Sequence, residues 1–97
     1  MKIAWNTVFK DIDGKEIKES GDKDLTLGRV AINALCQVTQ ADQSMTGEEK
    51  FKLGLLAHKI HTEPEAEFEA EEVSKIKDRI GKLYTPLMVF QAYNLLK

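Results

Sequence analysis

The first eighteen residues show the alternating pattern of a half-buried strand and its return. The residues Ile3, Trp5, Thr7 and Phe9 alternate with Ala4, Asn6 and Val8, and Asp13-Gly14 follows, a dipeptide suited to a turn with positive φ. We therefore predict a β-hairpin over residues 3–18. The side chains expected on its inner face are Ile3, Trp5, Thr7, Phe9 and Ile17. An isolated hairpin is marginal in water, so this one must lie on helices or pair with a strand from elsewhere.

Apolar residues spaced three and four apart predict helices in the rest of the chain. Thr26 precedes the first such stripe and is suited to an N-cap. Thr46 and Glu49 have the spacing of a capping box, and Thr85-Pro86 suits an N-cap followed by the first helical position. The predicted helices cover about residues 27–38, 47–60, 70–83 and 86–96, with a loop at 40–46.

The predicted helix at 86–96 is apolar on nearly all sides. A helix of this kind must be covered over most of its surface, and aromatic and methionine side chains are enriched at protein interfaces. We therefore expect one side to face the core and the other side to face a partner or a second copy of the chain, and the alternative is a helix buried entirely in the core. The residues predicted to form this interface are Leu87, Phe90, Tyr93 and Leu96.

Together these elements predict an α+β domain, in which an N-terminal β-hairpin packs on a bundle of about four α-helices. The 97 residues suit a single domain spanning 1–97, and a hydrophobic fraction of 42% is enough for one core. The single cysteine, Cys36, excludes an intramolecular disulfide, and the N-terminus lacks the apolar stretch of a signal peptide. Gln91 and Asn94 interrupt the terminal apolar run, which is too short for a membrane span. We expect a cytoplasmic protein.

Charge gives three further observations. The formal net charge of −2 disfavours direct binding of nucleic acid, which needs clustered Lys and Arg. Six glutamates lie between residues 63 and 72, where they either imitate nucleic-acid phosphates toward a basic partner or form a solvated loop and helix start. The residues of this possible acidic surface are Glu65, Glu67, Glu69, Glu71 and Glu72. Lys75, Arg79 and Lys82 share a helix face, which we interpret as part of a surface ion-pair lattice.

No catalytic or cofactor motif is found in the sequence, and no cofactor is expected. The acidic residues around Gly14 lack the end ligands of a calcium loop, and the glycine motifs that bind phosphate are absent. Cys36 lies in an apolar helix, which favours a small buried residue over a nucleophile. His58 and His61 are three residues apart and could bind one metal, but the chain has neither the zinc-protease motif nor a cysteine pair.

Four stretches of the sequence carry a family resemblance. They are Asp13-Gly14-Lys15, "TLGRVAINAL" (26–35), "GEEKFKLGLLAHKI" (47–60) and "EEVSKIKDRIGKLYTPLMVFQAYNLL" (71–96). In these stretches the chain resembles small uncharacterised proteins encoded by tailed phages and prophages. The resemblance implies a phage or prophage setting inside a bacterial cell, and it transfers no catalytic or binding residue.

These observations predict a non-enzymatic protein-binding accessory module of phage or prophage type. We expect it to self-associate through its last helix, as a homodimer, without contact with a membrane. Two other function classes stay open. One is an acidic inhibitor or nucleic-acid mimic acting on a host protein, and the other is a small metal-binding protein or enzyme centred on His58 and His61.

Overall fold

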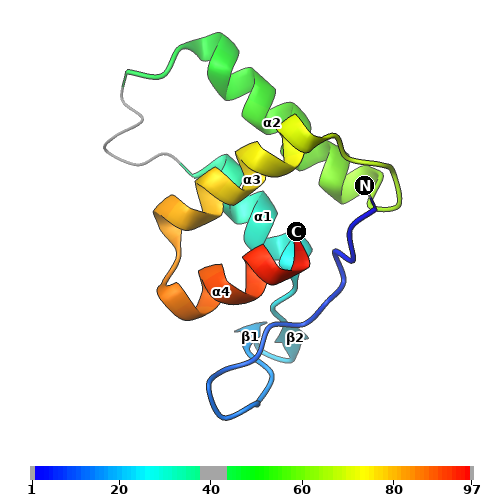
Figure 1. Ribbon diagram of the computed structural model, residues 1–97, viewed down its shortest axis with the longest axis vertical. Coiled ribbons are helices and arrows are strands. Elements are labelled where there is room, and N and C mark those ends of the chain that lie inside the picture. Colours follow the sequence, from blue (N-terminus) through cyan, green and yellow to red (C-terminus); the bar gives the residue numbers. More distant parts are fainter. Residues whose placement is uncertain (1, 38–43, 97) are drawn as a thin grey trace.

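A computed structural model describes residues 2–37 and 44–96 of the chain (Figure 1). Within these residues the backbone forms a two-stranded antiparallel sheet and four helices, which confirms the predicted α+β class. Helix α1 lies at the centre, where α2 and α3 both pack against it, and α4 packs against α3. The elements are β1 (Lys18–Ser20), β2 (Lys23–Asp24), α1 (Leu27–Cys36), α2 (Gly47–Thr62), α3 (Ala70–Leu83) and α4 (Pro86–Leu95).

Threonines begin three of these helices, at the positions that the sequence indicated. The Thr26 hydroxyl accepts a hydrogen bond from the backbone N–H of Arg29 at 3.3 Å, at the start of α1. The Thr46 hydroxyl accepts one from the N–H of Glu49 at 3.1 Å, at the start of α2. Thr85 is the N-cap of α4 and is followed by the proline of its first turn. Side-chain hydrogen bonds therefore mark the starts of α1 and α2, and Pro86 at the first helical position marks the start of α4.

The far ends of three helices differ from the predicted ends by one or two residues, and α3 ends at Leu83 as predicted. Helix α2 continues to Thr62, two residues beyond the predicted end, and α4 stops at Leu95. Helix α1 ends at Cys36 rather than at 38. Residue 38 and most of the predicted loop at 40–46 lie outside the described residues.

The β-hairpin lies later in the chain than the predicted hairpin at 3–18. Its strands are β1 and β2, joined at Gly21, whose φ is 56°. The predicted first strand forms only isolated bridges. The N–H of Phe9 donates to the carbonyl of Leu25 at 2.8 Å, while the Phe9 carbonyl accepts from the N–H of Ile17 at 2.9 Å. The backbone of Phe9 therefore forms hydrogen bonds with two later segments of the chain. For this reason residues 3–9 do not pair with a single second strand.

The predicted turn at Asp13-Gly14 is present within this region. Gly14 has a φ of 84°, a conformation that side chains with a Cβ rarely adopt. One carboxylate oxygen of Asp11 accepts hydrogen bonds from the backbone N–H groups of Asp13 and Lys15, both at 2.9 Å. Asp11 therefore closes a loop through its side chain, which accounts for the acidic cluster around Gly14.

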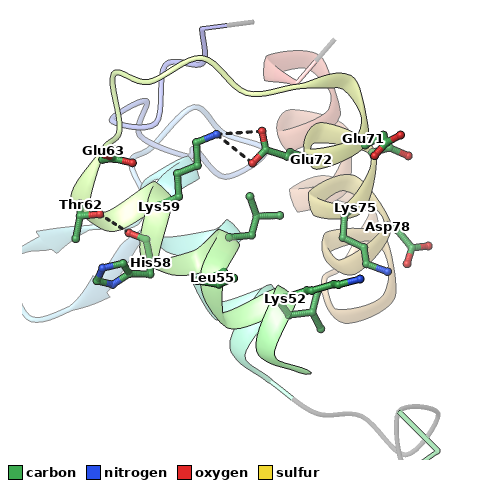
Figure 2. A pocket seen from close by; sticks show the side chains of 13 residues that line it. Lys52, Leu55, His58, Lys59, Thr62, Glu63, Glu71, Glu72, Lys75 and Asp78 are labelled. Carbon is green, nitrogen blue, oxygen red and sulfur yellow. Dashed lines mark hydrogen bonds and ion pairs between the residues drawn. The ribbon is translucent and has the colours of Figure 1, made fainter. Parts of the chain in front are cut away.

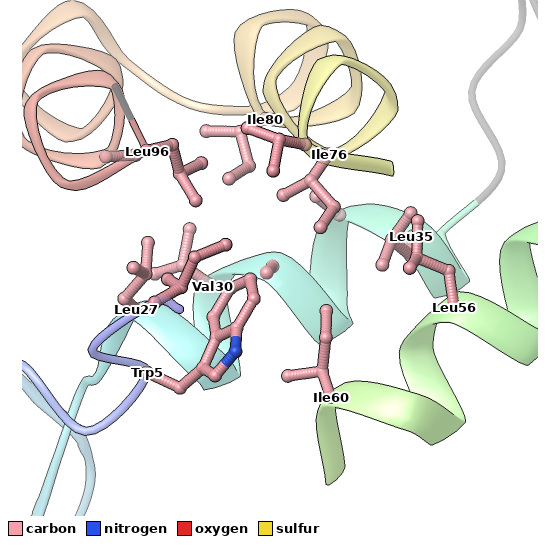
Figure 3. Packing of buried hydrophobic residues seen from close by; sticks show 14 of the residues in the cluster. Trp5, Leu27, Val30, Leu35, Leu56, Ile60, Ile76, Ile80 and Leu96 are labelled. Carbon is pink, nitrogen blue, oxygen red and sulfur yellow. The ribbon is translucent and has the colours of Figure 1, made fainter. Parts of the chain in front are cut away.

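The N-terminal segment seals the core even though it is not a strand. Ile3, Trp5 and Phe9 are buried, as their alternation predicted. The Trp5 carbonyl accepts a hydrogen bond from the N–H of Gly28 at 2.8 Å, and a Cβ at position 28 would lie 3.2 Å from that oxygen. Figure 3 shows the Trp5 ring beside Leu27 and Val30 of α1 and Ile60 of α2. A glycine at position 28 permits this close approach.

Arg79 is buried at the far end of α1, which corrects its predicted place on a surface lattice. Its side chain is 2% exposed and donates hydrogen bonds to the carbonyls of Ala34 at 3.2 Å and Gln37 at 2.6 Å. The last carbonyls of a helix have no partner within the helix. The guanidinium supplies partners for two of them, and it thereby ties α3 to the end of α1.

Helix α4 is covered on one side only. Met88, Ala92 and Leu96 are buried against the core, whereas Phe90 is 63% exposed. The Gln91 amide binds the backbone of Lys10 on both sides, donating to its carbonyl at 2.7 Å and accepting from its N–H at 2.9 Å. These bonds fix α4 to the N-terminal segment and leave its outer face open.

Candidate functional site

Helix α2 carries apolar side chains on two opposite faces. The inner face is buried against α1 and consists of Leu53, Leu56, Ala57 and Ile60. On the outer face Phe51 is 65% exposed and Leu55 is 52% exposed. The two lie four residues apart, so they are neighbours on one side of the helix. A helix with apolar groups on both faces is suited to being covered on both. We call Phe51 and Leu55 the outer ridge.

A groove runs between α2 and α3 next to this ridge. Both helices pack on α1, and the hollow between them has a volume of about 910 Å³. Its apolar part is contributed by Leu53, Leu55 and Leu56 of α2, and charged side chains stand on both walls (Figure 2). The groove therefore combines an apolar strip with polar flanks, as helix-binding grooves do.

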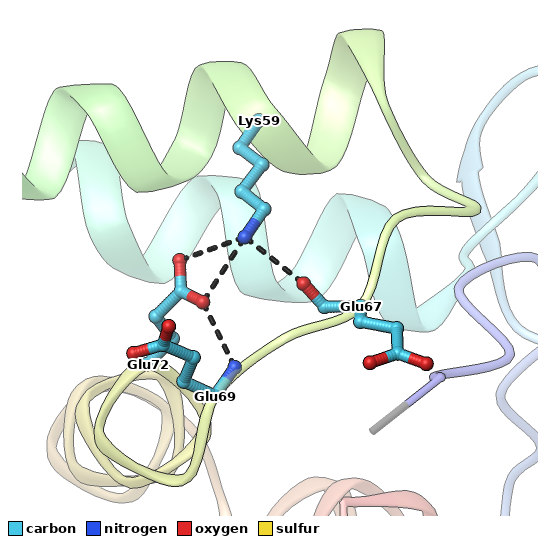
Figure 4. A network of polar contacts seen from close by, with 4 residues as sticks. All are labelled: Lys59, Glu67, Glu69 and Glu72. Atoms are coloured by element: carbon cyan, nitrogen blue, oxygen red, sulfur yellow. Dashed lines mark hydrogen bonds and ion pairs between the residues drawn. The ribbon is translucent and has the colours of Figure 1, made fainter.

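Lys59 and Glu72 cross the groove and hold its walls at a fixed separation. The Lys59 ammonium lies 3.0 Å from both carboxylate oxygens of Glu72 and donates to the Glu67 carbonyl at 3.1 Å (Figure 4). It also lies 4.4 Å from the centre of the Phe68 ring. Phe68 in turn meets the Trp5 ring edge-on, with centroids 5.1 Å apart. One lysine thus ties α2 to the segment that leads into α3.

The carboxyl of Glu72 also begins α3. It accepts a hydrogen bond from the N–H of Glu69 at 2.9 Å, and the two residues form a reciprocal capping box. Partial burial raises the pKa of Glu72, but the Glu69 N–H and the Lys59 ammonium outweigh it and hold the pKa below its usual value. Glu72 is therefore held in its charged form by its two partners.

The predicted acidic surface is in part structural. Glu72 and Glu69 are engaged at the start of α3, and the Glu67 backbone binds Lys59. Glu65 and Glu71 are exposed. The five residues span a loop and the first turn of α3, and among the described residues the carboxylates of Glu65, Glu67 and Glu71 form no hydrogen bond or ion pair.

The two histidines do not share a site. His58 lines the α2–α3 groove, whereas His61 lines a separate hollow beside Trp5 and Pro64. Both side chains are exposed. In the described part of the chain, no three His, Cys, Asp or Glu side chains gather in a way that could hold a metal ion.

The four residues predicted as an interface on the last helix do not form one surface. Leu96 is 1% exposed and belongs to the core, which corrects its predicted place at an interface. Tyr93 is half-buried, and its hydroxyl donates to the Lys77 carbonyl at 2.9 Å. Phe90 is exposed and Leu87 is half-buried. The open part of α4 is therefore smaller than predicted and centres on Phe90.

Cys36 is exposed, which corrects its predicted burial. It is the last residue of α1 and borders a small hollow together with Arg79 and Lys50. Within the described residues that line this hollow there is no histidine or carboxylate to act as a base. The surroundings do not form a thiol–base pair.

The outer ridge and the groove were missed by sequence reasoning, which predicted the helix at 47–60 without distinguishing an outer apolar face. The available signal was the separation of Phe51 and Leu55 by four residues on the side opposite Leu53, Leu56 and Ile60.

A comparison with family models, curated proteins and solved structures gave no match for this chain. None of the helices in the described residues has the length and apolar character needed to cross a membrane.

Proposed function

We propose that the chain is a non-enzymatic protein-binding module, which receives a helix of a protein partner in the α2–α3 groove. The observation that carries this proposal is the outer ridge, because Phe51 and Leu55 stand exposed beside a groove whose walls are charged. Burial of the exposed parts of the two side chains would contribute on the order of 2–3 kcal/mol to binding.

A helix is the partner element that fits this groove. Helices that bind in grooves place apolar residues one turn apart onto an apolar strip, and polar residues on either side meet the walls. The strip is offered by Leu53, Leu55 and Leu56, and the walls by lysines and acids of α2 and α3. The sequence resemblance to phage and prophage proteins suggests partners within an infected bacterial cell.

Quantitative affinity capture from a bacterial lysate tests this role when wild type is compared with two variants. Leu55→Glu places a charge on the outer ridge, and Ile12→Glu places one on an equally exposed apolar side chain, 84% exposed, in the N-terminal loop. We expect proteins held by wild type and by the Ile12 variant to be lost with the Leu55 variant. A captured set that Leu55→Glu leaves unchanged would contradict the proposal.

Helix α4 supports a second candidate, self-association through Phe90. The supporting observation is that Phe90 is 63% exposed, with half-buried Leu87 and Tyr93 on the same helix. Light scattering of wild type and Phe90→Asp separates the two candidates. If Phe90→Asp lowers the molecular mass in solution and Leu55→Glu does not, the interface lies on α4 and not in the groove.

A further inference from the structure

The charges in the groove are arranged as two ends of opposite sign. Lys52 of α2 and Lys75 of α3 extend toward one another from the two walls (Figure 2). Within the described part of the chain neither ammonium has an ion-pair partner, whereas Lys59 is paired with Glu72. Asp78 also lines this end, but its carboxylate lies 3.2 Å from the ammonium of Lys82. Two unpaired ammonium groups facing one another favour a carboxylate between them.

The opposite end of the groove is acidic. Glu63 follows the last turn of α2 and Glu71 lies in the first turn of α3, and neither carboxylate has an ion-pair partner among the described residues. From residue 52 to residue 63 the helical rise spans roughly 16 Å. Along α2 the cationic and acidic groups are therefore about three helical turns apart, whereas on α3 Glu71 and Lys75 are about one turn apart.

We propose that the groove receives α2 of a second copy of this chain, with the two copies antiparallel about a two-fold axis. This proposal rests on the protein-binding role of the groove. In this arrangement the outer ridge of each copy enters the groove of the other, while the Lys52–Lys75 end of one groove meets the Glu63–Glu71 end of its mate. A two-fold interface uses the same patch twice, so it must be complementary to itself. A parallel pair would instead gather four lysines at one end and four glutamates at the other.

The size of the contact sets the expected affinity. A helix of 16 residues is about 24 Å long, and one such helix on each side gives an interface near the lower limit for specific complexes. We therefore expect a dimer that dissociates at micromolar concentration and whose Kd rises with salt, because its polar contacts lie at the exposed ends.

Sedimentation velocity over roughly 5–500 µM tests the dimer, and a charge exchange tests its orientation. We expect wild type to reach twice the monomer mass and Leu55→Glu to stay monomeric. Lys52→Glu alone and Glu63→Lys alone should each raise the dimer Kd about tenfold, because each replaces two attractions by repulsions. The double variant, Lys52→Glu with Glu63→Lys, should return the Kd to within about threefold of wild type, since the exchange restores opposite charges across the two-fold axis.

Lys50→Glu is the matched control, because this lysine is on the same helix and outside the groove. Its Kd should equal that of wild type. The antiparallel dimer is wrong if the chain is monomeric throughout, if Lys52→Glu behaves like Lys50→Glu, or if the double variant does not recover. A monomeric chain whose protein capture still depends on Leu55 would overturn the dimer while leaving the binding role intact. If neither association nor capture responds to Leu55→Glu, the binding role fails as well.

Discussion

Helices α1 and α2 pack against one another, but they differ in how fully the rest of the chain covers their apolar side chains. The apolar side of α1 is fully covered, and even the carbonyls at its far end receive a buried guanidinium from Arg79. Helix α2 is covered on its inner face and leaves Phe51 and Leu55 exposed on its outer face. The difference indicates that the hydrophobic core of the domain is built around α1. The apolar residues on the outer face of α2 are not part of this core.

We expect one of the largest losses of stability from replacing Arg79, whose side chain covers the end of α1. Arg79→Ala removes the donors for the carbonyls of Ala34 and Gln37 and leaves a cavity, so we expect a loss of about 3 kcal/mol in the free energy of unfolding. Urea unfolding followed by circular dichroism measures it. Arg79→Lys keeps the charge without the planar fork and should lose less than Arg79→Ala. A loss below about 1 kcal/mol for Arg79→Ala would contradict a sealing role.

The two faces of α2 can be compared directly with the pair Leu53→Ala and Leu55→Ala. Leu53 is 5% exposed and Leu55 is 52% exposed. We expect the inner substitution to cost about 2–4 kcal/mol of unfolding free energy and the outer one to stay within about 0.5 kcal/mol of wild type, both measured on dilute protein. Equal costs would mean that the two faces do not differ as the structure indicates.

The Lys59–Glu72 pair across the groove should make the free energy of unfolding depend on pH. The pKa of Glu72 is lowered in the folded chain, so its stabilisation is complete above the ordinary glutamate pKa and is lost as the pH falls through the lowered value. Glu72→Gln keeps an oxygen for the Glu69 N–H and loses the ion pair, so it should cost about 1–2 kcal/mol at neutral pH. The cost should shrink as the pH falls below the ordinary glutamate pKa, as unfolding curves at neutral and at acidic pH would show. A cost independent of pH would exclude the ion pair as its source.

A smaller loss of stability than at Glu72 is expected where α4 meets the N-terminal segment. Gln91→Ala removes two hydrogen bonds to the Lys10 backbone, at sites that water can reach, and should cost about 1 kcal/mol. Hydrogen exchange should show faster exchange at the Lys10 amide in this variant. Unchanged exchange at that amide would mean that the Gln91 contact does not protect it.

Local chemistry made the helices predictable. Threonine caps mark three helix starts, and the spacing of apolar residues gives the inner faces of α1 and α3. The hairpin was misplaced because Phe9 forms backbone hydrogen bonds with Ile17 and with Leu25, an arrangement that alternation within one segment does not encode. Gly14 and Gly21 both adopt positive φ, and the sequence marked only the first as a turn.

The candidate site was less predictable because it depends on how helices sit together. An apolar residue such as Leu55 looks the same in a sequence whether it faces the core or solvent, and only the packing of α2 on α1 decides which. Burial of Arg79 likewise depends on the end of α1, which lies more than forty residues earlier in the chain. The acidic run had a local role as a helix start, which the sequence did offer as one interpretation.

Amide chemical shifts recorded by NMR across a dilution series test the central claim most directly, because they locate association without any substitution. If two copies of the chain associate through the α2–α3 groove, the shifts that change with concentration belong to Lys52, Leu55, His58 and Lys75, and the amide of Phe90 stays constant. Changes confined to α4 around Phe90, or no change up to roughly 500 µM, would contradict self-association through this groove.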